Sequence, residues 1–182
     1  MNNYKKKKEP IENRKLILET AIELANTQEL SQISFDALSK KCGLSKGGII
    51  HHFPTKESIF DTLFKENFEE YKNWVQEEIK SQDLPNPAMA LLTITLRKCN
   101  DESYRKLMKV IYKCLVNNEQ YCQLWNEWFS EYIIKNLDKD SEIKTLLGSL
   151  VAMGIWNMNT LGLYQIETQK MNQILNVLYQ TP

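Results

Sequence analysis

The 182-residue sequence lacks the features that mark several classes of protein. No stretch approaches the roughly 18 consecutive apolar residues of a transmembrane helix, which argues against a protein that spans a membrane. The N-terminal lysines are not followed by an apolar run, so we expect no signal peptide and a location in the cytoplasm. With 42% hydrophobic and 25% charged residues, the composition is that of an ordinary globular protein.

Patterns for metal binding and catalysis are scarce as well. The four cysteines, at positions 42, 99, 114 and 122, form no C-x-x-C pair, and the two histidines are adjacent. Neighbouring side chains point about 100° apart on a helix, which disfavours one metal ion between the histidines. Because neither a Glu-x-x-His pair nor a P-loop is present, we predict that the protein is not an enzyme and needs no cofactor or metal. We expect reduced thiols, with a disulfide between Cys114 and Cys122 as the alternative.

Proline and glycine are also few, at five and six residues, and they cluster at a few positions. Between them apolar residues recur every three or four positions, and the alternation typical of strands is nearly absent. This periodicity predicts an all-α fold. The expected helices span residues 11–28, 35–42, 46–53, 56–82, 88–99, 102–117, 119–137, 142–164 and 168–180.

Charges of the two signs balance, with 23 basic and 23 acidic residues, but they are unevenly spread. Residues 1–65 carry 11 Lys or Arg against 8 Asp or Glu, whereas residues 66–182 carry 12 against 15. The positive surplus in the first third is compatible with a polyanionic partner. Residues 1–10, with lysines at 5–8, are predicted to form a flexible basic arm. This arm either reaches a DNA minor groove or only solubilises the chain.

Two short predicted helices are joined by the segment Gly43-Leu44-Ser45. Ser34 and Ser45 are favourable N-cap residues, and Gly43 suits the left-handed position that ends a helix. This arrangement is typical of a helix-turn-helix, whose second helix enters the major groove of DNA. Gly47 and Gly48 are poor helix formers, by about 1 kcal/mol each relative to alanine. They indicate either a close approach of the backbone to DNA or a loosely packed segment.

Three further side chains suit contacts with nucleic acid. His51 and His52 either touch phosphate or base edges at the rim of a groove or lie at a solvated helix end. Lys56 begins the long fourth helix, where its charge suits a phosphate contact, although most exposed lysines have no such role.

The segment Gly43–Ser58, GLSKGGIIHHFPTKES, closely resembles the recognition segment of the TetR family of bacterial transcriptional regulators. In that family a stretch like G-V-S-K-G-x-L-Y-H-Y-F-x-S-K-E links the recognition helix to the long fourth helix. The resemblance covers about residues 11–65. It implies an N-terminal three-helix DNA-binding domain at residues 11–56, followed at residues 57–182 by a helical bundle for ligand binding and dimerisation.

Positions that match the family's segment carry the implied residue roles. The implied DNA contacts are Ser34, Ser45, Lys46, Gly47, Gly48, His51, His52 and Lys56. The implied core residues are Phe35, Leu38, Leu44, Ile49 and Phe53. The family often has tyrosine where this chain has Ile50, and the missing hydroxyl removes one phosphate contact.

The C-terminal region is rich in aromatic and sulfur-containing side chains, which suit an apolar effector. Candidate effector contacts are Phe68, Tyr71, Trp74, Met108, Tyr112, Trp125, Trp128, Phe129, Met153 and Trp156. Small residues within 146–164 would let another helix approach closely, as in the penultimate helix of TetR-type regulators. Candidate dimer contacts are Gly148, Ser149, Ala152, Ile155, Met171, Ile174, Leu175 and Leu178. For both sets, ordinary core packing is the alternative.

Together these features predict a homodimeric, ligand-responsive transcriptional regulator that does not bind membranes. We expect a repressor that releases a palindromic operator in double-stranded DNA when a small, largely apolar molecule binds the C-terminal domain. A helical protein-interaction adaptor without effector binding is the alternative.

Overall fold

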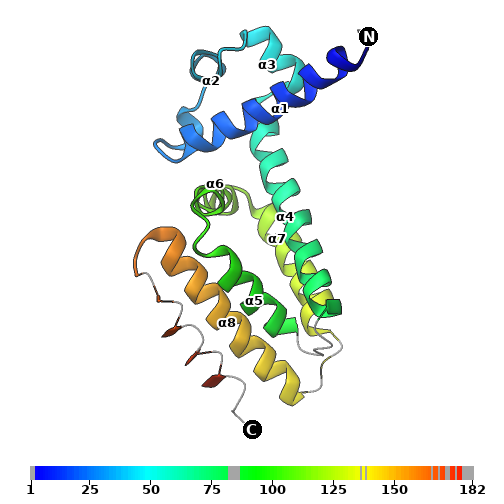
Figure 1. Ribbon diagram of the computed structural model, residues 1–182, viewed down its shortest axis with the longest axis vertical. Helices are drawn as coiled ribbons and strands as arrows, with labels where there is room; N and C mark the ends of the chain where they lie inside the picture. Colours follow the sequence, from blue (N-terminus) through cyan, green and yellow to red (C-terminus); the bar gives the residue numbers. More distant parts are fainter. Residues whose placement is uncertain are drawn as a thin grey trace. The chain divides into compact units, whose positions relative to one another are not determined.

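The computed structural model describes residues 3–81, 87–135, 137, 139–164, 166–167, 169–170, 173–174 and 176–177. Throughout this part of the chain every regular element is helical, which confirms the predicted all-α fold (Figure 1). None of its helices combines the length and hydrophobicity needed to cross a lipid bilayer. The elements are α1 (Asn3–Ala25), η1 (Leu30–Gln32), α2 (Phe35–Cys42), α3 (Lys46–His52), α4 (Lys56–Ser81), α5 (Pro87–Lys98), α6 (Glu102–Asn117), α7 (Glu119–Trp128), the π-helical segment η2 (Phe129–Ile134) and α8 (Lys139–Leu161).

The first helix begins earlier than the sequence indicated. Residues 3–10, predicted as a flexible arm, form the first turns of α1, which contains Pro10. Lysine and glutamate are good helix formers, so a run of them favours the extension of the helix. Whether the lysines at 5–8 reach DNA remains a prediction, because their side chains lie outside the described part. Most of the predicted helix at 168–180 lies outside it too.

The chain divides into two compact units. Unit 1 comprises Met1–Asn67 and Val110–Asn117, and unit 2 comprises Phe68–Lys109 and Asn118–Pro182. The division between these compact units falls within α4, whereas the boundary between the DNA-binding and ligand-binding regions was predicted at residue 56 and stays a prediction. Since no proline or glycine interrupts residues 56–81, one continuous helix serves both units. Helix α6 does the same.

A lysine on α6 explains why the end of that helix belongs to unit 1. The Lys113 ammonium donates hydrogen bonds of 3.0 Å to the carbonyl oxygens of Ala25 and Gln28, and lies 3.4 Å from the Glu29 carboxylate. The last carbonyls of a helix lack partners within it and carry partial negative charge. Lys113 thus supplies the donors that the end of α1 needs.

The neighbouring Cys114 thiol is buried in unit 1. Burial, with a smaller effect from the Asp61 carboxylate, raises the pKa of the Cys114 thiol to about 12. All four cysteines are free thiols, so the alternative of a Cys114–Cys122 disulfide is wrong. An uncharged buried thiol behaves as a small apolar side chain.

The core of unit 1 follows the predicted pattern at its centre. Leu38 of α2, Ile49 of α3 and Phe53 after α3 are buried, and the Arg14 guanidinium lies 5.6 Å from the centre of the Phe53 ring. On α1 the buried face consists of Ile17, Leu18, Ala21 and Ala25. Phe35 and Leu44, also predicted as core, are half-buried.

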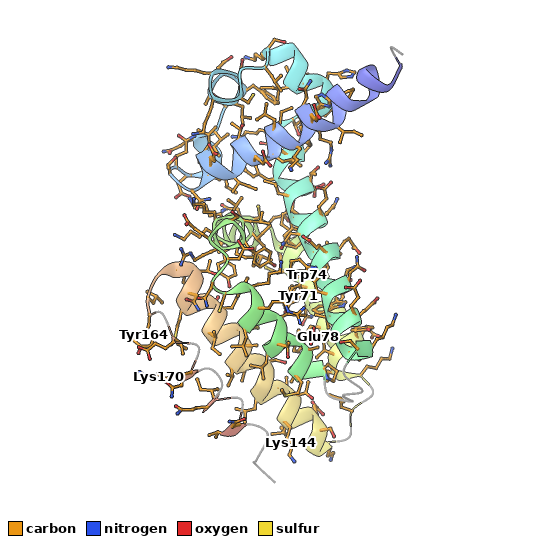
Figure 2. The ribbon with its side chains drawn as sticks, viewed as in Figure 1. Tyr71, Trp74, Glu78, Lys144, Tyr164 and Lys170 are labelled. Atoms are coloured by element: carbon orange, nitrogen blue, oxygen red, sulfur yellow. The ribbon has the colours of Figure 1, made fainter. Side chains whose placement is uncertain are left out.

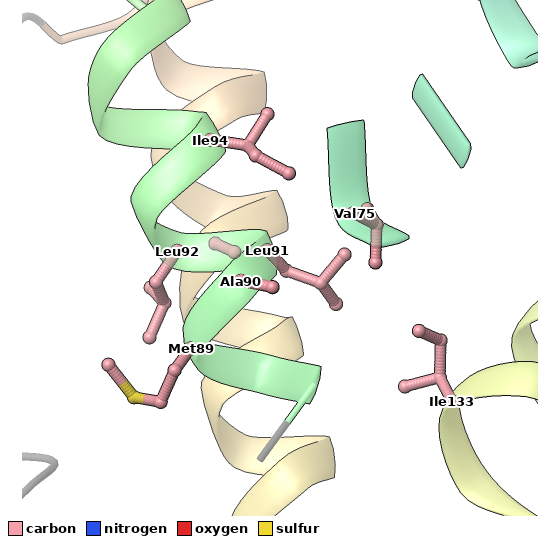
Figure 3. Packing of buried hydrophobic residues seen from close by; sticks show 8 residues of the cluster. Val75, Met89, Ala90, Leu91, Leu92, Ile94 and Ile133 are labelled. Atoms are coloured by element: carbon pink, nitrogen blue, oxygen red, sulfur yellow. The ribbon is translucent and has the colours of Figure 1, made fainter. Parts of the chain in front are cut away.

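The core of unit 2 is built where α5 packs along α8 (Figure 3). Residues 88–92 of α5 are all buried, and they are joined by Ile94, by Val75 of α4 and by Ile133 of η2. The closest approach is at Gly148 of α8, where an added Cβ would lie 2.7 Å from the Cβ of Ala88. Gly148 therefore sets the spacing between α5 and α8.

We predict that Gly148→Ala destabilises the protein. The new methyl group meets a carbon that is fixed to the α5 backbone, so the two helices must move apart, at a cost of about 1–3 kcal/mol. The helix-forming preference of alanine offsets about 1 kcal/mol of that at most. The measurement is the urea midpoint of unfolding.

Removing the opposing methyl group provides the matched control. The double variant Ala88→Gly with Gly148→Ala should regain stability relative to Gly148→Ala alone, because the glycine has only changed helices. If the double variant is instead less stable than the wild-type protein by the sum of the two single effects, the contact between positions 88 and 148 does not determine the packing of α5 against α8.

Candidate nucleic-acid interface

The turn between α2 and α3 is built by side-chain caps. The Ser34 hydroxyl accepts a hydrogen bond from the backbone N–H of Ala37 at 3.2 Å, and the Ser45 hydroxyl accepts one from Gly48 at 3.1 Å. Between these caps, Gly43 ends α2 in the left-handed conformation, with φ of 74°. These local bonds fix where each helix begins and ends, as the sequence predicted.

The two faces of α3 differ sharply. Ile49 has no exposed surface, whereas Ile50 is 41% exposed and His51 is also exposed. Around Gly47 no atom lies within 4 Å of the position that a Cβ would take. The helix is therefore anchored on one side through Ile49 and presents its other side outward.

The two glycines of α3 have different surroundings. A Cβ on Gly48 would lie 3.2 Å from the Ser45 hydroxyl oxygen, so the glycine there leaves room for the cap of its own helix. Only Gly47 opens onto free space. The contacts within the protein therefore explain the glycine at position 48 but not the glycine at position 47, where a close approach to DNA stays the prediction.

Basic side chains surround this outward face, and two of them already have partners. The Lys46 ammonium lies 3.2 Å from the Asp36 carboxylate, and the Lys56 ammonium donates a 2.8 Å hydrogen bond to the Ser31 carbonyl. Exposed ion pairs of this kind contribute little stability, so a phosphate can replace the carboxylate at small cost. The ring centres of His51 and His52 lie 5.5 Å apart, edge to face.

Sequence reasoning missed one basic residue near this site. Lys40 is exposed in the last turn of α2 and forms no hydrogen bond or ion pair within the described residues. By contrast, its neighbour Lys41 pairs with Glu23 at 3.0 Å. The available signal was the position of Lys40 three residues before the turn.

Residues 43–47 also spell G-x-S-x-G, a string found around the nucleophilic serine of some hydrolases. That chemistry requires the serine at a sharp turn from a strand to a helix. Here Ser45 lies between two helices, and its hydroxyl serves as an N-cap. No group of three potential metal ligands occurs among the residues described.

The predicted effector contacts gather mainly in unit 2, in two groups of rings. The first group surrounds Trp128 and contains Phe68, Tyr71, Trp125 and Tyr132. The second consists of Trp74, Tyr104 and Trp156, with ring centres 5.4 and 5.1 Å apart. Figure 2 shows Tyr71 and Trp74 on the same helix, α4. Tyr104 and Tyr132 were not among the predicted contacts.

The other predicted effector contacts lie elsewhere. Met108 is buried, and Phe129 packs against the core between α5 and α8. Tyr112 belongs to unit 1, and Met153 is 45% exposed on α8.

The α8 residues predicted for a dimer interface face inward. Ser149, Ala152 and Ile155 are buried, and Gly148 contacts Ala88 within the same chain. In the single chain these four residues therefore contribute to the core, which was the alternative, and their predicted dimer contacts stay a prediction. Ile174 is half-buried, and the remaining three predicted contacts, Met171, Leu175 and Leu178, lie outside the described residues.

The outer side of α8 instead carries an apolar stripe that the sequence analysis missed. Its members are exposed and recur at helical spacing: Ile143, Leu147, Leu150, Met158 and Leu161. The signal was present as the i, i+4, i+7 pattern of the first three.

Comparisons with known proteins agree with this geometry. Residues 17–63 match the sequence model of the family described as "Bacterial regulatory proteins, tetR family". Over 114 residues the chain is 28% identical to the HTH-type transcriptional regulator AcrR of Shigella flexneri. That match covers 60% of this chain and about half, 53%, of the relative.

Two solved structures share the fold over most of both chains. NalD, described as the secondary repressor of a multidrug efflux pump in Pseudomonas aeruginosa, superposes with a TM-score of 0.65 at 14% identity, covering 95% of this chain and 96% of NalD. A TetR family transcriptional regulator from Pseudomonas syringae superposes with a TM-score of 0.63 at 19% identity, covering 91% of each chain.

The match at residues 17–63 spans the C-terminal part of α1, the short helices α2 and α3, and the first turns of α4. It therefore contains the outward-facing α3 and its neighbours in the sequence. The predicted resemblance is thereby confirmed for residues 17–63, which match the TetR family, whose members are regulators of transcription and not enzymes.

Proposed function

We propose that this protein is a cytoplasmic, DNA-binding transcriptional repressor that acts as a homodimer. The observation that carries the proposal is the outward face of α3, with open space at Gly47 and the helix held by buried Ile49. Two such helices, related by a two-fold axis, fit successive major grooves of a palindromic operator. Binding of a small, largely apolar effector to unit 2 then releases the DNA.

The roles of individual contacts follow from their chemistry. The Ser34 and Ser45 hydroxyls, together with Lys46, His51, His52 and Lys56, are placed for phosphate and groove-rim contacts, and we add Lys40 to this set. Such contacts hold the protein in register, whereas base edges next to Gly47 and Ile50 supply sequence preference.

Selection of fragmented genomic DNA by the purified protein, followed by sequencing, tests the proposal directly. We expect enrichment of fragments that share an inverted repeat, with affinity that falls steeply as salt rises. Enrichment of no fragment would contradict DNA binding and favour the protein-interaction adaptor.

Gly47→Ala separates DNA binding from folding. The methyl group enters open space in the free protein, so stability should rise by up to about 1 kcal/mol through helix propensity. On DNA the same methyl group occupies the path of the duplex, and we expect operator affinity to fall about tenfold or more. Titration by fluorescence anisotropy measures the affinity, and thermal unfolding measures the stability.

An operator affinity that stays unchanged in Gly47→Ala would show that DNA does not approach α3 closely. Gly48→Ala is an informative comparison, because its methyl group meets the Ser45 cap and should lower stability instead.

A matched pair at Ser45 tests the charge at the interface. Asp and Asn both cap helix N-termini well, so Ser45→Asp and Ser45→Asn should fold with similar stability. They differ by one negative charge, which repels nearby phosphates and should make operator binding about tenfold weaker in the Asp variant. Equal affinities at low salt would place Ser45 away from the DNA backbone.

Homodimerisation is proposed to use the exposed stripe on α8. Isolated apolar side chains are common on protein surfaces, but a continuous stripe along a helix marks a contact surface. Two copies related by a two-fold axis would pair the same stripe with itself.

Leu150→Glu should convert the dimer to a monomer, because a carboxylate would be buried in the centre of the contact. Leu150 is 67% exposed in the single chain, so the substitution leaves the fold of one subunit intact. Val116→Glu is the control, since Val116 is 86% exposed on α6 and lies off the stripe. Sedimentation velocity reports the mass; a dimeric Leu150→Glu variant would assign dimerisation to another surface.

A further inference from the structure

One buried donor in unit 2 has no partner. The indole nitrogen Nε1 of Trp128 is shielded from solvent and forms no hydrogen bond within the described residues. An indole N–H only donates, and leaving such a group unpaired in the interior costs free energy. The great majority of buried polar groups in proteins have a hydrogen-bond partner, so this exception points to a missing acceptor.

The surroundings of Trp128 are aromatic on several sides. Its ring centre lies 5.4 Å from Trp125, 5.9 Å from Phe68, 5.9 Å from Tyr71 and 6.2 Å from Tyr132. Phe68 and Tyr71 belong to α4, Trp125 and Trp128 to α7, and Tyr132 to η2. These rings offer flat apolar surfaces but no carbonyl or carboxylate to the indole.

The backbone beside Trp128 is also unusual. Helix α7 ends at this residue and continues as the π-helical segment η2. Short π-helical segments have poorer packing than an α-helix and occur frequently at functional sites. The unpaired indole and the π-helical segment are independent observations at one place.

Positive charge already lies over neighbouring rings. The Lys72 ammonium is 4.9 Å from the centre of Phe68 and pairs with the Glu69 carboxylate at 2.7 Å. In the second group of rings, the Lys98 ammonium is 4.2 Å from the centre of Trp74. The carboxylate of Glu78, buried in the same unit, is held by Arg97 at 2.8 Å. A ligand cation would be repelled by the lysine ammonium groups and would find the Glu78 carboxylate already paired. A neutral or anionic ligand would not be repelled by these lysines.

We propose that Trp128 binds the hydrogen-bond acceptor of a flat aromatic effector that is neutral or anionic. The effector's oxygen accepts the Nε1–H, and its ring lies among Phe68, Tyr71 and Trp125. Access requires one neighbouring ring to move. Tyr71 and Trp125 are half-buried and stacked at 5.5 Å, so an inserted ring replaces one stacking contact by two. This inference names the chemical class of the effector in the proposed function.

Two simpler arrangements compete with an effector. The ring of Trp128 meets Phe68 edge-on, at 86°, and in the first competing arrangement the N–H group points at a ring face as a weak donor. Alternatively a buried water accepts the proton. Neither arrangement makes the indole signal depend on an acceptor in a ligand.

Three naphthalene derivatives of similar size test the proposal on the full-length protein without DNA. 2-Acetylnaphthalene carries a carbonyl acceptor, 2-ethylnaphthalene lacks one, and 2-naphthyltrimethylammonium carries a cation. The measurements are dissociation constants and the NMR signals of the tryptophan indole N–H groups, with ¹⁵N labelling. We expect the ketone to bind most tightly, the cation most weakly, and the Trp128 signal to move downfield with the ketone alone.

Trp128→Phe removes the donor and keeps an aromatic ring. It should weaken binding of the ketone about fivefold and leave the hydrocarbon within about twofold, as expected for one net hydrogen bond. Trp156→Phe, in the second group of rings, is the matched control and should leave the ketone's affinity unchanged.

The proposal is overturned if the ketone does not bind the folded wild-type protein, if it leaves the Trp128 signal in place, or if the cation binds more tightly. The wild-type spectra decide this even if Trp128→Phe does not fold. Because no DNA is present, failure here leaves the proposed DNA binding intact, and absence of operator binding would equally leave this result standing.

Discussion

The burial of Ile49 and Phe53 is the contact on which the nucleic-acid interface depends. These two side chains hold α3 and the residue after it against the rest of unit 1, so that the opposite face of the short helix, with Gly47 and Ile50, is turned outward. Seven residues are too few for a helix to persist alone. The Ser45 cap and the two buried side chains therefore stabilise α3 and fix its orientation.

Sequence reasoning was decisive where the signal was local, and it left two alternatives where a pattern has two physical solutions. Ser34, Gly43 and Ser45 specify helix ends through bonds to residues at most four positions away, and the structure forms those bonds. The small residues near Gly148 required only that some helix approach closely. The sequence could not distinguish α5 of the same chain from a helix of a partner, and the prediction chose the partner.

The division into compact units depends on a different kind of information. Breaks in the hydrophobic pattern locate helix ends, but the division between the units runs through uninterrupted helices, at Asn67 in α4 and near Val110 in α6. Each of these two helices contributes residues to both units. Within unit 1, the hydrogen bonds from Lys113 to the Ala25 and Gln28 carbonyls join α6 to the end of α1.

The buried polar groups without hydrogen-bond partners in unit 2 are compatible with a protein that binds an effector, as proposed above. Besides the Trp128 indole, the buried Asn159 amide has neither its nitrogen nor its oxygen hydrogen-bonded within the described residues. Asn159 follows Trp156 by one turn of α8, so each group of rings has an unsatisfied polar side chain beside it. An apolar residue at either position would stabilise the empty protein. A ligand that forms hydrogen bonds with these groups binds more tightly to the conformation in which they are unpaired. Its binding therefore shifts the conformational equilibrium toward that state.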